Sequence, residues 1–515
     1  MKKYTITFFI AISLMFLLIS WNKNEREKSL STIRDLNPEI EKKVDSVLSL
    51  MRINEKIGQL VQYSGKWNVT GPTSSKKDQY KLEKIKKGEV GSMLNVTSVK
   101  TVRNIQEINM KHSRLKIPLI FAFDVIHGYK TIFPIPLGES ASWDLDIIEQ
   151  SASIAARESA ASGLNWTFAP MIDVSRDARW GRIMESAGED VYLNSVIGVA
   201  RIKGFQGDDL SDDLTIAACA KHFAGYGFAE AGREYNTVTI GENELYNTIL
   251  PPFKAAAQAG VATFMNSFND IDGIPATGHK RLQRDVLKGT WKWNGLIVSD
   301  WASIGEMKAH GFARDKKHAA EIALNAGCDM DMESYAYESS LHTLLDEDKV
   351  GIEQIDDAVR RVLRLKFQLG LFDNPYKYCD EEREKKEVYT KENLSIARDV
   401  AKRSIVLLKN ENKLLPLSKN IKRIAVIGPM ANDKDTPLGN WRAKGEYNSA
   451  VSLLEGVKSM VGINTEVLYA KGVDLIIPNI KPGENQYKLP LKFNTTDNSK
   501  IARAVEVAKK SDVVL

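Results

Sequence analysis

One acidic residue, Asp300, follows a predicted buried strand and is a candidate catalytic carboxylate. It follows the branched apolar run Leu296-Ile297-Val298 and precedes Trp301. Three branched apolar residues after a glycine predict a short strand buried on both faces. The carboxyl end of such a strand lies at the rim of an α/β fold, where loops gather and ligands bind. The alternative is that Asp300 caps the next helix, because Asp is a preferred N-cap.

Other apolar runs in the chain also end in polar residues. The third ends at Asp124, the fourth at Asp173, the fifth at Lys221 and His222, and the sixth at Met265-Asn266-Ser267. Because parallel strands share one carboxyl face, these ends are expected to converge with Asp300 on one pocket.

The spacing of these runs predicts the architecture. Eight strand-like runs occupy residues 58–62, 90–94, 118–123, 164–172, 216–222, 261–266, 296–300 and 326–330. Helix-length stretches such as 39–51, 144–162, 242–259 and 352–369 lie before, between and after them. The fold class is therefore α/β, and residues 33–375 are predicted to form a (β/α)8 TIM-like barrel.

A second domain follows the barrel. Residues 376–400 are predicted to be a linker and helix, with the charged stretch 380–386 lying over the surface. Strand-like runs at 404–409 and 424–427, the latter ending at Gly428-Pro429, open an α/β sandwich over residues 401–515. The run at 511–515 resembles the first half of a buried strand, so we expect this sandwich to be incomplete and the chain to be truncated.

Composition excludes several functions. The chain has 515 residues, which suggests two or three domains, and a net charge of +5 with no basic block interleaved with aromatics. Nucleic acid is therefore not an expected partner. The three cysteines lie far apart, and the sequence has no GxSxG, HExxH, P-loop or dinucleotide motif. We expect no metal and no cofactor.

The N-terminus has the pattern of an export signal. Lys2 and Lys3 precede the apolar run 8–19, and a charged stretch follows at 22–28. Residues 1–28 are predicted to be a cleaved signal peptide or a retained anchor, and both alternatives stay open. The expected location is periplasmic or extracellular, with membrane contact only through this segment if it is uncleaved.

The predicted pocket combines three kinds of side chain suited to a sugar. Carboxylates and basic groups hydrogen-bond vicinal hydroxyls, and aromatic rings pack against the C–H faces of a sugar ring. The candidates are Asp124, Asp300, Arg182, Lys221, His222, Tyr226, Phe268 and Trp301. Two carboxylates about 5 Å apart cleave a glycosidic bond with retention. A barrel isomerase or aldolase would need a Schiff-base lysine, for which Lys221 is the candidate, but the adjacent His222 fits sugar binding better.

Several motifs in order resemble glycoside hydrolase family 3, and within it the bacterial periplasmic β-glucosidases. They lie at residues 123–128, 177–182, 185–186, 188–190, 221–223, 298–301, 404–410 and 415–417, and the resemblance runs from about Leu48 to the end. It implies a retaining, exo-acting β-glycosidase that acts on a β-linked oligosaccharide or aryl glycoside.

The resemblance also implies roles for particular residues. Asp300 falls on the family's nucleophile, which forms a covalent glycosyl-enzyme. Met265 and Trp301 line the sugar subsite, and Trp301 reaches toward the leaving group. The residues that hold the hydroxyls of the non-reducing-end sugar are Asp124, Arg182, Lys221 and His222.

Two departures qualify the resemblance. The loop at 225–233 lacks the Asp-Ser-His triplet of the hexosaminidase branch, which argues against that branch. In the β-glucosidases that the chain resembles, the acid/base glutamate lies on a loop shortly after the strand that begins at Val513. It would fall beyond residue 515, so the alternative is a catalytically impaired carbohydrate-binding fragment.

Other conspicuous residues receive structural interpretations. Asp177 and Arg179 are expected to brace a loop as a buried ion pair, and His127 to be a packing residue. Trp441 is either a second aromatic wall of the pocket or a core residue. Surface positions are expected for His279, His310, His318 and His342.

Overall fold

The computed structural model describes residues 36–65, 76–476 and 492–515. The predicted signal or anchor at 1–28 lies outside them. The described residues form two compact units, one reaching Ile405 and including Trp441–Ala443, the other comprising Val406–Asn440 and Lys444–Leu515. In this part of the chain, no helix combines the length and apolar character needed to span a membrane.

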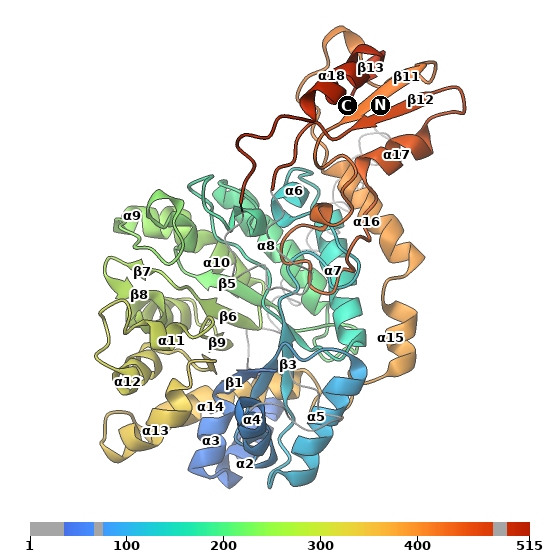
Figure 1. Ribbon diagram of the computed structural model, residues 1–515. Coiled ribbons are helices and arrows are strands. Elements are labelled where there is room, and N and C mark those ends of the chain that lie inside the picture. Colours follow the sequence, from blue (N-terminus) through green and yellow to red (C-terminus); the bar gives the residue numbers. More distant parts are fainter. Residues whose placement is uncertain (1–35, 66–75, 477–491) are drawn as a thin grey trace, which may run out of the picture. The chain divides into compact units, whose positions relative to one another are not determined.

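Eight short parallel strands form the centre of the first unit (Figure 1). They are β1 (Val61–Ser64), β2 (Ser92–Leu94), β3 (Ile120–Phe123), β4 (Trp166–Thr167), β5 (Cys219–Phe223), β6 (Thr263–Asn266), β9 (Leu296–Val298) and β10 (Asp331–Met332). The hydrogen-bonded orders are β10-β1-β2-β3-β4 and β5-β6-β9. Single bridges between Trp166 and Ala217 and between Val298 and Met330 join the two sheets. The circle is thereby closed, and the predicted barrel is confirmed.

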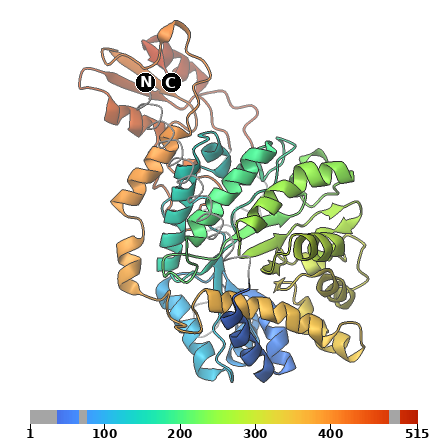
Figure 2. The ribbon, with the colours of Figure 1, turned by 180° about the vertical axis from the view of Figure 1, so that it is seen from behind.

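Helices surround these strands (Figure 2). They are α2 (Pro38–Leu50), α3 (Ile53–Gln59), α4 (Lys76–Lys86), α5 (Val99–His112), α6 (Pro136–Ser140), α7 (Leu145–Ala161), α8 (Val191–Gln206), α9 (Glu242–Glu244), α10 (Leu250–Gln258), α11 (Ser303–Glu306), α12 (Lys316–Ala326), α13 (Ala336–Asp346) and α14 (Ile352–Gln368). The first unit also contains two π-helical segments, Leu245–Ile249 and Arg281–Thr290. It has a short hairpin of β7 (Asp270–Ile271) and β8 (Ile274–Pro275).

Acidic side chains cap several of these helices. Asp144 accepts a hydrogen bond from the N–H of Ile147 at the start of α7, and Asp190 accepts one from Leu193 at the start of α8. Each cap satisfies an N–H group that the helix leaves without a partner. The barrel interior is filled by side chains. The indole N–H of Trp166 on β4 reaches Thr263 Oγ1 on the non-adjacent strand β6 at 2.9 Å.

Several predicted elements differ from the structure, and the fourth predicted strand, 164–172, is reduced to the two residues of β4. The first strand begins at Val61, after α3, and the eighth is preceded by α12, which continues to Ala326 and ends at Gly327 with φ of +106°. Short apolar runs beside a helix do not reveal which element they join. The charged stretch 380–386 is mostly helical, as α15 (Glu381–Glu387) capped by Asp380. With α16 (Lys391–Arg403), it lies alongside α7 (Figures 1 and 2).

The second unit contains a parallel sheet in the order β12-β11-β13. Its elements are β11 (Arg423–Ile427), α17 (Leu453–Met460), β12 (Glu466–Ala470), α18 (Ile501–Lys509) and β13 (Val513–Val514). The strand predicted at 424–427 is therefore confirmed, and the run 511–515 contains β13; its predicted burial is wrong, because Val514 is 50% exposed. The strand predicted at 404–409 is wrong, because this run pairs with no strand of the described chain and Leu408 is 91% exposed.

Candidate active site

Asp300 lies two residues after β9 and is 8% exposed. Its Oδ1 accepts the N–H of Trp301 at 2.6 Å, and its Oδ2 lies 3.6 Å from Nε2 of His222. Helix α11 begins at Ser303, its N-cap residue is Ala302, and no side chain caps it. The helix-cap alternative for Asp300 is therefore wrong, and its second oxygen faces the imidazole of His222.

The structure brings together side chains from strands that are not neighbours. Lys221, in β5, donates from Nζ to Oδ1 of Asp124, which follows β3, at 3.1 Å. Lys221 is buried, whereas Asp124 keeps part of its side chain exposed. This pairing confirms that the polar ends of the third and fifth strands converge.

Arg182 is held by a two-pronged contact with Glu185. Its Nε and Nη2 donate to the two oxygens of Glu185 at 2.7 and 3.0 Å. A short 3₁₀ turn, Ile183–Glu185, sets this spacing. Planar forks of this kind orient the guanidinium more strictly than a single contact does. Glu185 thus belongs to the candidate site, although the sequence analysis gave it no role.

Trp441 adds an aromatic ring to the same group. Its indole N–H donates to Glu185 Oε1 at 3.0 Å, and Arg182 and Lys221 lie 5.9 and 5.6 Å from the ring centroid. The side chain is 43% exposed. Of the two alternatives, a core position is therefore wrong, and the exposed ring beside the cations fits an aromatic wall.

His222 is fully buried and fixed by Asp173. Both its backbone N–H and its Nδ1 contact Asp173 Oδ2, at 2.9 and 2.8 Å. Tyr226 meets the imidazole edge-on, with ring centroids 5.0 Å apart. The sequence places Asp173 at the end of the fourth strand, but it does not predict that His222 is the residue it contacts.

Burial dominates the electrostatics of the site. It raises the pKa of Asp300 to about 6, although Arg182 and Lys221 act in the opposite direction. Burial also lowers the pKa of His222 well below its ordinary value, and the same two cations reinforce the effect. The imidazole is therefore neutral, and the ionised form of Asp300 depends on the neighbouring cations.

The two remaining predicted residues differ in exposure. Met265 is buried on β6, where it pairs with Val298 of β9 and belongs to the barrel's apolar core. Trp301 is 44% exposed beside Asp300. The role of Met265 in lining the sugar subsite stays a prediction.

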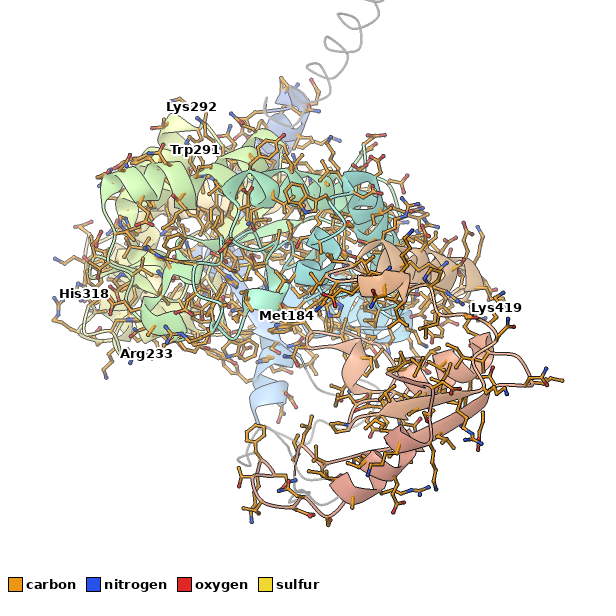
Figure 3. The ribbon with its side chains drawn as sticks, turned by 90° about the horizontal axis from the view of Figure 1, so that it is seen from above. Met184, Arg233, Trp291, Lys292, His318 and Lys419 are labelled. Atoms are coloured by element: carbon orange, nitrogen blue, oxygen red, sulfur yellow. The ribbon has the colours of Figure 1, made fainter. Side chains whose placement is uncertain are left out.

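The structural interpretations are partly confirmed. His127 is buried, with Nδ1 2.8 Å from the carbonyl oxygen of Phe133. The Asp177–Arg179 pair exists at 2.6 Å, but Arg179 is 73% exposed, so its predicted burial is wrong. His279 is buried, contrary to expectation, because it packs at the start of the π-helical segment 281–290. His342 is exposed, and His318 lies at the outer edge of the barrel unit (Figure 3).

Within the residues that the structure describes, no three His, Cys, Asp or Glu side chains are grouped so as to hold a metal ion.

Comparisons with known proteins identify the family. The model of the glycosyl hydrolase family 3 N-terminal domain matches residues 52–365, and that of its C-terminal domain matches residues 405–515. The chain belongs to glycosyl hydrolase family 3. A periplasmic β-glucosidase from Salmonella typhimurium is 40% identical to this family 3 chain over 478 residues, which cover 92% of this chain and 61% of that protein.

Solved structures resemble it as well. A β-glucosidase from Listeria innocua in complex with glucose has a TM-score of 0.82 and 38% identity, covering 92% of this chain and 63% of that one. A β-glucosidase from Erythrobacter marinus has a TM-score of 0.84 and 28% identity, covering 93% and 65%. This family 3 chain thus spans less than two thirds of the length of these relatives.

Proposed function

We propose that this family 3 member is a retaining, exo-acting β-glycosidase of the β-glucosidase type. In this proposal, Asp300 attacks the anomeric carbon of the non-reducing-end sugar and forms a covalent glycosyl-enzyme. The supporting observation is the position of Asp300: a buried carboxylate at a strand end, with one oxygen held by the backbone and the other facing His222.

The charge balance supports the same role. Burial makes the carboxylate form of Asp300 costly, which is why its pKa rises to about 6. Bond formation to a sugar removes that charge, so glycosylation relieves the cost. Arg182 and Lys221 act on the carboxylate from a distance, which preserves its ionised state for attack.

Sugar hydroxyls have suitable partners around this carboxylate. Lys221 with Asp124 and Arg182 with Glu185 offer donors and acceptors in fixed pairs, while Trp301 and Trp441 offer exposed aromatic faces. We propose that these groups bind the terminal sugar of a β-linked oligosaccharide or aryl glycoside. Glucose is the proposed sugar, since the relatives described above are named β-glucosidases.

The stereochemistry of the product tests this proposal. An activated aryl β-glucoside, whose leaving group needs no protonation, is incubated with the chain, and the first-formed product is followed by proton NMR. Azide serves as a second acceptor, in case water attack on the glycosyl-enzyme is slow. We expect a β-configured product, either glucose or glucosyl azide; an α-configured first product would contradict the proposal. The rate on a matched aryl β-xyloside, compared with the rate on the β-glucoside, measures the sugar preference.

We further propose that the protein is exported. Support comes from the Lys2-Lys3 pair before the apolar run 8–19, and from the relative named as periplasmic. Residues 1–28 fused to an enzyme that folds only after export should give an active reporter, whereas an inactive reporter in the cytoplasm would contradict this.

A further inference from the structure

Asp173 makes an unusual double contact with a single residue. One of its oxygens, Oδ2, accepts the backbone N–H of His222 at 2.9 Å and lies 2.8 Å from Nδ1 of the same residue. The backbone sets this pairing, because the N–H of Ile172 bonds to the carbonyl of Lys221 at 2.8 Å and aligns the two segments. The other oxygen, Oδ1, is buried and has no hydrogen-bond partner among the described residues.

This geometry fixes the tautomer of His222. A neutral imidazole carries one proton, and the ring nitrogen that faces an acceptor must hold it. Since Nδ1 faces Asp173 Oδ2, the proton lies on Nδ1 and Nε2 presents a lone pair. A proton added to Asp173 would occupy Oδ1, and Oδ2 would still accept both N–H groups.

The other ring nitrogen faces the proposed nucleophile. Nε2 of His222 lies 3.6 Å from Oδ2 of Asp300 and has no hydrogen-bond partner in the described part of the chain. Two acceptors therefore face each other with no proton between them. A bare pair of buried acceptors is costly unless a bound molecule supplies a donor.

We propose that Asp173 is a positioning residue that holds His222 in the Nδ1–H form, so that Nε2 accepts a hydrogen bond from a ligand hydroxyl and donates none to Asp300. The ligand in this proposal rests on the glycosidase function proposed above; the tautomer does not. In the opposite tautomer, an Nε2–H would point at Asp300 Oδ2. That hydrogen bond would occupy the lone pairs with which Asp300 attacks.

Two substitutions separate this role from a simple loss of charge. In Asp173→Asn, the backbone N–H of His222 selects the orientation that presents the amide oxygen, so one oxygen still accepts both N–H groups. The amide nitrogen then takes the place of Oδ1. In Asp173→Ala, no acceptor remains and the proton is free to move to Nε2. Asn should therefore preserve the Nδ1–H tautomer, and Ala should lose it.

The closing experiment reads the tautomer directly, without substrate. Protein labelled with ¹⁵N-histidine is studied by NMR, and a His222→Gln variant assigns the signals of His222 among the seven histidines. Asp331→Ala is the matched control, because Asp331, the first residue of β10, is also buried and accepts the backbone N–H groups of Ser334, Ala336 and Tyr337.

We expect a protonated Nδ1 and an unprotonated Nε2 in the wild type, in Asp173→Asn and in Asp331→Ala, and a protonated Nε2 in Asp173→Ala. On aryl glucosides, kcat/KM should fall roughly 10- to 100-fold in Asp173→Ala and by less in Asp173→Asn. A protonated Nε2 in the wild type, its appearance in Asp173→Asn, or retention of Nδ1–H in Asp173→Ala would overturn the proposal. If Asp173→Ala does not fold, the spectra of the wild type and of Asp173→Asn still test which ring nitrogen of His222 carries the proton.

Discussion

The two ends of strand β9 are flanked by buried carboxylates whose surroundings differ sharply. Beside its beginning, Asp329 accepts Lys288 Nζ on both oxygens, at 2.8 and 3.0 Å, and the N–H of Ile297 at 2.8 Å. Beyond its other end, Asp300 receives one backbone N–H, from Trp301. A buried charge with a full set of partners holds the barrel together, whereas one with an incomplete set is free for chemistry.

The largest expected effect is a loss of activity on substituting Asp300, beyond the carboxyl end of β9. Asp300→Asn removes the proposed nucleophile and should lower kcat/KM on activated aryl glucosides by on the order of 10⁴-fold or more, while the barrel stays folded. Steady-state kinetics and circular dichroism measure the two quantities. Activity within tenfold of wild type would show that another residue attacks the sugar.

Substituting Asp329, beside the start of β9, should lower the free energy of unfolding. Asp329→Ala leaves Lys288 buried without its anion, and breaking a buried pair from one side costs about 3 to 5 kcal/mol. Burial already lowers the pKa of Lys288 to about 8, so part of the cost is relieved by deprotonation. Urea denaturation of this variant and of Asp300→Asn measures the contrast. Equal losses in the two variants would remove the distinction between the ends.

A substitution within the site sharpens the contrast further. Lys221→Gln removes the cation that contacts Asp124 and should weaken glucose binding roughly 10- to 100-fold, the usual range for a charged hydrogen bond. The matched control is Lys317→Gln, which breaks the exposed pair with Glu347 at 2.9 Å. Calorimetry should find no change in the control; similar losses in both would point to a general effect of charge.

The pH dependence of stability tests the burial of Asp300. Its pKa is about 6 in the folded chain against 3.8 ordinarily, so ionisation destabilises the folded state. The cost is absent below about pH 4, grows as the pH rises through 6, and is then constant at about 1 to 3 kcal/mol. Asp300→Asn should therefore be more stable than wild type at pH 8 but not at pH 3.5. Parallel stability curves for the two proteins would contradict the raised pKa.

The smallest effect is expected on the surface. Asp177→Asn breaks the exposed pair with Arg179, although the residue lies in a family motif. Exposed pairs contribute little to stability, so the melting temperature and kcat/KM should both match wild type. A clear loss of activity would mean that this pair belongs to the site.

Much of the barrel could be predicted from the sequence, and so could the convergence of its polar strand ends, since parallel strands gather their carboxyl ends on one face. Asp124 and Lys221 were expected together for that reason, and they are in contact. The pairing of Arg182 with Glu185 and of His222 with Asp173 was not predicted, because loop conformation decides it. The apolar run 404–409 was mistaken for a strand, since its residues suit a sheet but pair with none in the described chain.

Covalent trapping tests the central claim most directly. The chain is incubated with a 2-deoxy-2-fluoro-β-glucoside that carries a good leaving group, then digested and sequenced by mass spectrometry, with Asp300→Asn treated in parallel. We predict one fluoroglucosyl group on Asp300 in the wild type and none in the variant. A fluoroglucosyl group on any other residue of the wild type would contradict the assignment of Asp300 as the nucleophile.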